Sequence, residues 1–141
     1  MKIIYTYLVM DLLHEGHLLY LKNAKSLADI DGKLIVGILT NEAVMEKKSK
    51  PILSFSERIR VAEAIKYIDV VVAQETYSPL ENVVSIKPDI LVESTSHDFE
   101  DVEEIANELK ALNINTRIIQ LPYYPSQSST DIKKKIKGET E

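Results

Sequence analysis

Two of the chain's three histidines, His14 and His17, stand three residues apart, directly after an apolar run that begins at Ile3. The spacing places both imidazoles on the first turn of a helix, where backbone N–H groups lack partners and the helix dipole is positive. Such a helix start attracts phosphate, and Gly16 between the histidines lets a ligand approach the backbone. A polar helix cap would use the same residues, so the pair alone leaves both interpretations open.

A second group of polar residues lies near the end of the chain. Residues 126–130 read Ser-Gln-Ser-Ser-Thr and follow the last apolar run, which ends at Leu121. Their hydroxyls and amides would stand at another helix N-terminus, where an ordinary N-cap is the alternative role. Two phosphate-suited helix starts at one edge of a sheet favour a phosphate-binding site over coincidence.

The elements that must hold these residues alternate along the chain. Short, β-branched and continuously apolar runs predict strands at 3–10, 33–39, 69–73, 89–92 and 116–121. Between them, helical patterns lie at 18–28, 54–67 and 100–113, and a capping box at 78–81 starts a further helix with Pro79 as its first residue. Continuous apolar runs are typical of parallel strands buried on both faces, and strand–helix alternation indicates βαβ units. We predict a Rossmann-like α/β fold: a doubly wound, five-stranded parallel sheet with flanking helices, forming a single domain over residues 1–141.

In such sheets ligands bind beyond the carboxyl ends of the strands, where both phosphate-suited segments fall. The longest irregular segment expected is Thr40 to Leu53, and connections of this length often act as lids. His97 follows the fourth predicted strand at the same edge and is therefore a candidate contact for an acceptor substrate.

Composition removes several classes of protein. A net charge of −5 argues against general nucleic-acid binding, and the absence of cysteine excludes a disulfide scaffold, a thiolate zinc site and a cysteine nucleophile. No apolar run approaches the 18 residues of a membrane span. We expect a soluble cytoplasmic protein without a nucleic-acid partner or membrane insertion.

The two segments together resemble a known family. Asp11-x-x-His14-x-Gly16-His17 resembles the HxGH signature of the cytidylyltransferase-like nucleotidyltransferases, and residues 126–133 resemble their second signature. Tyr5 to His14, the helix at 18–28, Ser56-Glu57-Arg58 and residues 65–69 also look like the glycerol-3-phosphate and phosphonate cytidylyltransferases. The resemblance runs from Ile3 to about Ile136.

The resemblance implies a reaction in which a phosphate or phosphonate oxygen attacks the α-phosphorus of a nucleoside triphosphate and pyrophosphate leaves. It implies catalytic roles for His14, His17 and Lys47, and nucleotide binding by Val9, Met10, Asp11, Gly16, Gln127, Ser128, Ser129 and Thr130. It also implies a homodimer and a Mg²⁺ ion held mainly by phosphates and water rather than by protein ligands.

Three basic residues align with substrate-side positions of the family, and each has a plainer alternative. Lys47 would neutralise the triphosphate, or belong to a solvated loop. Arg58 would contact substrate, or form an ordinary salt bridge, and Lys66 would contact substrate, or be a surface lysine at a helix end. Asp11 would reach a metal-bound water, or be a buried structural residue.

Two departures bear on the substrate. The family usually has Gly-Thr-Phe-Asp before its first histidine, whereas this chain has Leu8-Val9-Met10-Asp11. Where the glycerol-phosphate enzymes have Arg-Thr-Glu-Gly, this chain has Tyr123-Tyr124-Pro125-Ser126, and the missing arginine counts against a glycerol-phosphate acceptor.

We therefore expect transfer of CMP from CTP to a small phosphorylated or phosphonylated alcohol. An adenylyltransferase using ATP, of the FMN or pantetheine-phosphate type, is the first alternative. A nucleotide-binding regulatory module without turnover is the second.

Overall fold

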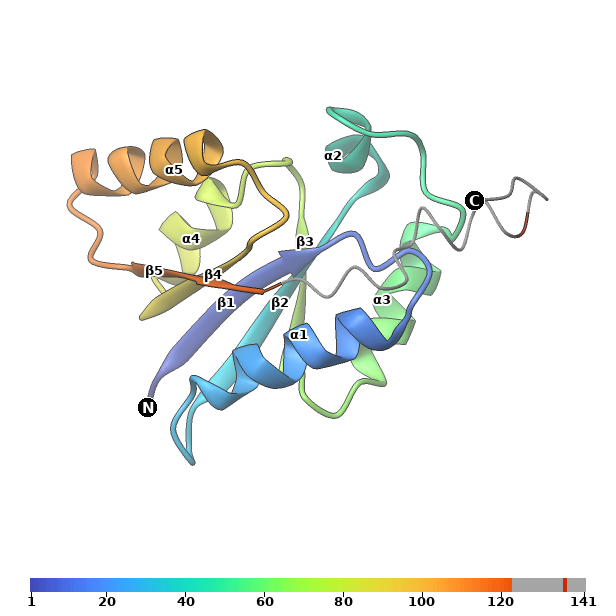
Figure 1. Cartoon of the computed structure of the whole chain (residues 1–141), viewed down its shortest axis with the longest axis horizontal. Coiled ribbons are helices and arrows are strands. Elements are labelled where there is room, and N and C mark those ends of the chain that lie inside the picture. Colours follow the sequence, from blue (N-terminus) through green and yellow to red (C-terminus); the bar gives the residue numbers. More distant parts are fainter. Residues whose placement is uncertain (123–135, 137–141) are drawn as a thin grey trace.

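The computed structural model describes residues 1–122 and residue 136, and Figure 1 shows its arrangement. The elements in chain order are β1 (Ile3–Leu8), α1 (Glu15–Ser26), β2 (Lys33–Leu39), α2 (Asn41–Met45), α3 (Phe55–Glu63), β3 (Val70–Gln74), α4 (Leu80–Ile86), β4 (Ile90–Ser94), α5 (Phe99–Ala111) and β5 (Arg117–Leu121). The described strands form one sheet in the order β3-β2-β1-β4-β5, with every pairing parallel. The predicted Rossmann-like fold is confirmed.

The strand order fixes where a ligand can bind. The chain winds outward from β1 through β2 to β3, and then crosses back to β4 on the other side of β1. The carboxyl ends of β1 and β4 therefore diverge into connections on opposite faces, which opens a crevice at this topological switch point. Residues 9–17 follow β1 and residues 95–98 follow β4, so both segments reach this crevice.

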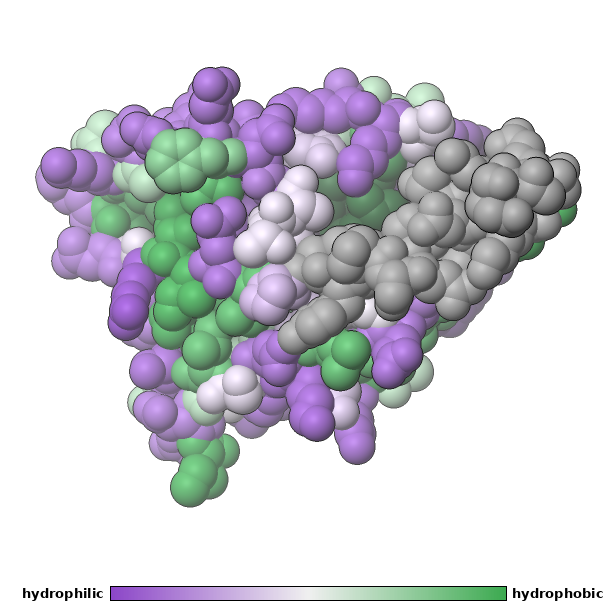
Figure 2. Space-filling model, in the orientation of Figure 1, coloured by the Kyte–Doolittle hydropathy of each residue, from purple (hydrophilic) through white to green (hydrophobic). Residues whose placement is uncertain are grey.

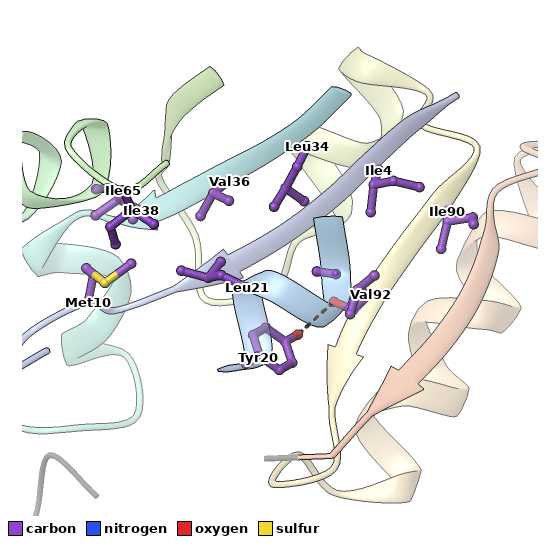
Figure 3. Packing of buried hydrophobic residues seen from close by; sticks show 12 residues of the cluster. Ile4, Met10, Tyr20, Leu21, Leu34, Val36, Ile38, Ile65, Ile90 and Val92 are labelled. Atoms are coloured by element: carbon purple, nitrogen blue, oxygen red, sulfur yellow. Dashed lines mark hydrogen bonds between the residues drawn. The ribbon is translucent and has the colours of Figure 1, made fainter. Parts of the chain in front are cut away.

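Helices cover both faces of the sheet. On one face, α1 and α3 pack on a core that includes Ile4, Leu21 and Val36, and the Tyr20 hydroxyl donates to the Val92 carbonyl at 3.4 Å (Figures 1 and 3). On the other face, α2, α4 and α5 cover a second core, with Tyr5, Leu91 and Leu109 among its residues. Continuous apolar strands are the expected consequence of a sheet buried on both sides.

Capping residues set where two of the helices begin. The predicted helix start at the two histidines is confirmed, because His14 is the N-cap and α1 begins at Glu15, ahead of the apolar stripe that starts at Leu18. The segment predicted to be irregular from Thr40 contains α2, because the Thr40 side chain accepts a hydrogen bond from Ala43 N at 3.1 Å and starts a helix.

Two further helix boundaries differ from their predictions. The helix that starts at the predicted capping box of Ser54 ends at Glu63 rather than near Tyr67, because Ile65 and Ile68 donate to carbonyls only three residues back and tighten the chain. Pro79 is the N-cap of α4 and not its first residue, and no capping box forms there.

The outer surface of the described part is mixed. On the face seen in Figure 2, hydrophobic residues gather beside the β5 edge of the sheet, and hydrophilic residues cover the rim over α5 and α2. No helix within residues 1–122 and 136 is long and apolar enough to cross a membrane.

Gly37 in β2 gives room to a polar contact inside the second core. The Tyr5 hydroxyl donates to Gln74 Oε1 at 2.6 Å and accepts from Asn82 Nδ2 at 2.8 Å, which ties β1 to β3 and α4. A Cβ atom on Gly37 would collide with this hydroxyl. We expect G37A to lower the free energy of unfolding by about 1–3 kcal/mol, measured by urea denaturation.

The matched control is the double variant Y5F/G37A. Because Y5F removes the oxygen that the new methyl group meets, the double variant should lose less stability than the sum of the two single variants. If the losses in the free energy of unfolding of the two single variants simply add in the double variant, the Tyr5 hydroxyl is not the reason that residue 37 must be glycine.

Candidate active site

The crevice at the switch point begins with an unusual backbone conformation. Met10, two residues after β1, has a φ of 59°, the left-handed region that costs a non-glycine residue roughly 1–2 kcal/mol. Its side chain is buried in the first core, which compensates for that cost. This turn lets the chain leave β1 and reach α1 within six residues, so the histidines lie close to the strand end.

His14 and His17 cap the helix that they start. Gly16 N donates to His14 Nδ1 at 3.0 Å, and His14 N donates to His17 Nδ1 at 3.2 Å, which makes a capping box from two imidazoles. The ring centroids are 4.1 Å apart, and both side chains are nearly buried. Because each Nδ1 accepts a hydrogen bond, each neutral ring carries its proton on Nε2.

Burial keeps both rings uncharged. Desolvation lowers the pKa of His14, and desolvation with the nearby His14 lowers the pKa of His17 to about 4. At neutral pH the site therefore holds two neutral imidazoles whose Nε2–H groups are hydrogen-bond donors. Such donors suit phosphate oxygens, and the arrangement does not depend on protonation near pH 7.

Arg58 organises the edge that carries these residues. Its side chain is fully buried, and its guanidinium donates to the carbonyls of Val9 at 2.7 Å and Leu39 at 2.6 Å and to Asn41 Oδ1 at 2.7 Å. The Nε atom donates to the Leu53 carbonyl at 3.3 Å. Arg58 thereby joins the ends of β1 and β2, the start of α2 and the chain before α3.

Asp11 stabilises the same region. Its carboxylate accepts from Ile52 N at 3.0 Å and from Leu53 N at 2.9 Å, and the residue is 3% exposed. Burial lowers the pKa of Arg58, and the charge of Asp11 opposes that shift. The two residues hold the segment before α3 against the end of β1.

Lys47 and His97 meet at a cavity on the other face of the sheet. The cavity has a volume of about 420 Å³, and Tyr7, Tyr77 and Glu93 also line it. The Lys47 Nζ atom lies 5.1 Å from the centre of the Tyr77 ring. The structure thus brings Lys47 and His97 into the lining of one cavity at the carboxyl edge of the sheet.

Within this cavity, Glu93 connects two aromatic side chains. Its Oε1 atom accepts from the Tyr7 hydroxyl at 2.7 Å and pairs with His97 Nδ1 at 2.7 Å. The Tyr7 and His97 rings are stacked with centroids 5.5 Å apart. Burial and the charge of Glu93 raise the pKa of Tyr7, so the Tyr7 hydroxyl stays protonated.

Lys66 lies apart from these groups. It is exposed between α3 and β3, at the amino-terminal edge of the parallel sheet, with Nζ 5.3 Å from the centre of the Tyr67 ring. The site residues predicted at 127–130 lie outside the described residues.

Sequence reasoning missed Glu93 and Tyr7. The signal for Glu93 was available, because a carboxylate inside the run Ile90-Leu91-Val92-Glu93 interrupts an otherwise apolar buried strand. Tyr7 carried no such signal, since a tyrosine in a strand is ordinary.

The structure is a parallel α/β sheet with two phosphate-suited histidines at its switch point, and the comparisons identify its class as that of the nucleotidyltransferases. A family model described as cytidylyltransferase-like matches residues 9–135, so the chain belongs to the cytidylyltransferase-like family.

The chain is similar in sequence to named relatives and in fold to a solved structure. The FAD synthase of Pyrococcus horikoshii is 34% identical over 135 residues, which cover 94% of this chain and 88% of that protein. The FAD synthase of Methanothermus fervidus is 34% identical over 130 residues, covering 90% of this chain and 89% of that protein. A crystal structure of the lipopolysaccharide core biosynthesis protein from Thermoplasma volcanium has a TM-score of 0.80 and 26% identity, covering 88% of this chain and 98% of that one.

The network of Arg58 leads to a stability prediction. R58K keeps the positive charge but cannot reach the same acceptors, so buried carbonyl groups lose their donors. We expect R58K to lower the free energy of unfolding by about 3 kcal/mol in urea denaturation. R60K, an exposed change on the same helix, should change it by no more than about 0.5 kcal/mol. Equal effects in both variants would contradict the role of Arg58.

The lowered pKa of His17 leads to a pH prediction. In the unfolded chain His17 takes up a proton near pH 6.5, and in the folded chain only near pH 4. Its contribution to the free energy of unfolding is therefore complete above pH 6.5 and is lost as the pH falls toward 4. Between pH 7.5 and pH 5, protonation of His17 should lower the free energy of unfolding by about 2 kcal/mol.

The control is H17Q, because glutamine keeps the capping box and does not titrate. Urea denaturation of H17Q should show a loss about 2 kcal/mol smaller than that of the wild type over the same pH range. Identical pH dependence in the two proteins would place the pKa of His17 at its ordinary value.

Proposed function

We propose that the protein is an adenylyltransferase that joins AMP from ATP to FMN, producing FAD and pyrophosphate. The observation that carries this proposal is the 34% identity to proteins named FAD synthase over nearly the whole length of both chains. These relatives favour the adenylyltransferase alternative over the expected transfer of CMP to a small phosphorylated alcohol.

The reaction needs positioning and charge stabilisation more than covalent help from the protein. A phosphate oxygen of FMN attacks the α-phosphorus of ATP, the bond from that phosphorus to the oxygen bridging to the β-phosphorus breaks, and pyrophosphate leaves with the bonding pair. Charge spreads over the oxygens of the α-phosphate as the new bond forms. The Nε2–H groups of His14 and His17 would donate to those oxygens.

The helix start supports this role of the two histidines. Both Nδ1 atoms are engaged by backbone N–H groups before any nucleotide binds. The rings are therefore fixed, and little reorganisation is needed when negative charge develops. Their neutrality keeps the site from binding pyrophosphate as tightly as two imidazolium ions would, which favours product release.

Other predicted residues take supporting roles in the proposal. Lys47, which lines the cavity, would neutralise charge on the triphosphate, and Gln127, Ser128, Ser129 and Thr130 would hold the triphosphate as the sequence predicts. Arg58 and Asp11 would position the backbone of Val9 and Met10, since their polar groups contact the chain itself. Lys66, at the far edge, has no part in this scheme.

A Mg²⁺ ion would accompany ATP. Within residues 1–122 and 136, no group of three or more histidine, aspartate or glutamate side chains is arranged to hold a metal. The Asp11 carboxylate, three residues before His14, accepts two backbone N–H groups. In this proposal, phosphate oxygens and water would carry the ion. The homodimer stays a prediction.

The function is tested by product formation. Purified protein with ATP, FMN and Mg²⁺ should form FAD and pyrophosphate, whereas CTP in place of ATP should give at least tenfold less product. Formation of a CDP-linked product from CTP and a phosphorylated alcohol would restore the original expectation. Binding of ATP without pyrophosphate release, across all acceptors tried, would support the regulatory module.

The role of His14 is tested with H14N. Asparagine is a good N-cap, so the helix should keep its start while the Nε2–H donor is lost. We expect kcat to fall by about two to three powers of ten, as for loss of one charge-stabilising donor, with the melting temperature nearly unchanged.

E15Q, an exposed change in the same helical turn, should leave kcat within about twofold of the wild type and serves as the matched control. An unchanged kcat in H14N would refute the placement of the site.

A further inference from the structure

One carboxylate oxygen of Glu93 is buried and accepts no hydrogen bond from the described residues. The residue is 1% exposed, and its Oε1 atom already takes the hydrogen bonds from Tyr7 and His97. Among the residues that the structure describes, the Oε2 atom has no hydrogen-bond partner. A buried carboxylate oxygen without a donor is costly, and the residue lines the cavity beside the switch point. A ligand that fills the cavity should therefore bring an N–H or O–H group to this oxygen.

The charged side chains that line the cavity determine which part of a substrate can enter it. Besides Glu93, five carboxylates line it: Glu46, Asp98, Asp101, Glu104 and Glu108. Lys47 and His97 are the basic side chains among its described lining residues. A phosphate group deep in this cavity would be repelled by the excess of carboxylates. The part of the acceptor that enters is therefore uncharged, and its phosphate remains toward the histidines.

The shape of the lining favours a flat ring. Tyr7 and His97 stack on each other at one side of Glu93, and Tyr77 is held by two contacts: its N–H donates to Glu46 Oε2 at 3.1 Å, and its ring lies under the amino group of Lys47. Aromatic walls around one polar group are typical of pockets for planar ligands, and the volume of about 420 Å³ lies within the usual range for small-molecule sites.

We propose that this cavity holds the isoalloxazine ring of FMN and that the imide N–H of the ring donates a hydrogen bond to Glu93 Oε2. This inference rests on the proposed function and makes Glu93 a specificity-determining residue. Tyr7 and His97 are positioning residues, because their hydrogen bonds to Oε1 hold the carboxylate in place and leave Oε2 for the ligand. The imide is the ring's one N–H donor in the oxidised flavin, so the pairing also fixes which edge of the ring enters first.

The decisive variant is E93Q. Because Tyr7 and His97 both donate to Oε1, the amide oxygen of glutamine takes that place and its NH₂ group points where Oε2 was. The cavity then presents a donor to the donor of the ring. We expect the KM for FMN to rise about tenfold to a hundredfold, the range that corresponds to an unmatched buried polar group, while kcat and the KM for ATP change by less than about twofold.

E103Q is the matched control. Glu103 is an exposed carboxylate on α5 outside this cavity, so its loss changes the charge by the same amount without touching the proposed contact. Its KM for FMN should equal that of the wild type. Equal KM values for FMN in E93Q, E103Q and the wild type, with FAD still formed, would overturn the inference and leave the proposed function standing.

A second measurement needs no variant of the protein. FMN methylated at the imide nitrogen cannot donate, so the wild-type enzyme should show at least a tenfold higher KM for it than for FMN. E93Q should discriminate much less between the two. Wild-type enzyme that uses both flavins equally well would overturn the inference even if E93Q fails to fold.

Riboflavin lacks the phosphate and cannot react, so its binding tests the flavin cavity independently of the proposed reaction. Titration of riboflavin fluorescence should show binding to the wild type and to E103Q, and binding at least tenfold weaker to E93Q. If no FAD forms in the wild type but riboflavin still binds through Glu93, the proposed function fails and the flavin cavity stands. If riboflavin binds equally to all three proteins, or to none, the cavity assignment is overturned.

Discussion

The buried guanidinium of Arg58 is the constraint on which the carboxyl edge of the sheet depends. A charge with no exposed surface is tolerated because its donors are matched to oxygen atoms: three carbonyls and the Asn41 side chain. Those oxygens belong to three segments of the chain: the end of β1 at Val9, the β2–α2 connection at residues 39–41, and Leu53 before α3. The end of β1 is therefore held at a fixed place relative to β2, α2 and α3, and the turn at Met10 starts from that place.

The fixed edge divides the site between the two faces of the sheet. On the α1 face, two neutral imidazoles and a helix start offer donors to anions. On the α4 and α5 face, the cavity is rich in carboxylates and presents an acceptor. A substrate with a phosphate at one end and a neutral ring at the other fits this division in only one orientation. The electrostatics of the two faces would thus select the direction in which an acceptor enters, before any close contact specifies its identity.

Much of this arrangement could be predicted from the sequence, and the remainder could not for identifiable reasons. The strands were predictable because continuous β-branched runs have few other uses, and the histidine pair was predictable because its spacing matches one helical turn. Arg58 was expected to contact substrate or form a salt bridge, and instead it donates mainly to backbone carbonyls. Carbonyl oxygens are present at every residue, so a side chain that binds them leaves no partner residue in the sequence to find. Lys66 lies at the amino-terminal edge of the sheet, and alignment with a family position does not say at which edge a side chain falls.

The histidine pair shows how folding and chemistry are joined in this protein. The capping box uses the Nδ1 atom of each ring, so formation of α1 selects the tautomer that has its proton on Nε2. Burial then keeps the rings neutral, because the desolvation that lowers the pKa of His17 to about 4 comes from the same packing that holds the helix on the sheet. A cap of aspartate would stabilise the helix equally well and would offer no donor, because an ionised carboxylate only accepts hydrogen bonds. The choice of imidazole at both positions therefore lets one set of hydrogen bonds stabilise the helix start and leave an Nε2–H donor on each ring, the group that the proposed function assigns to phosphate oxygens.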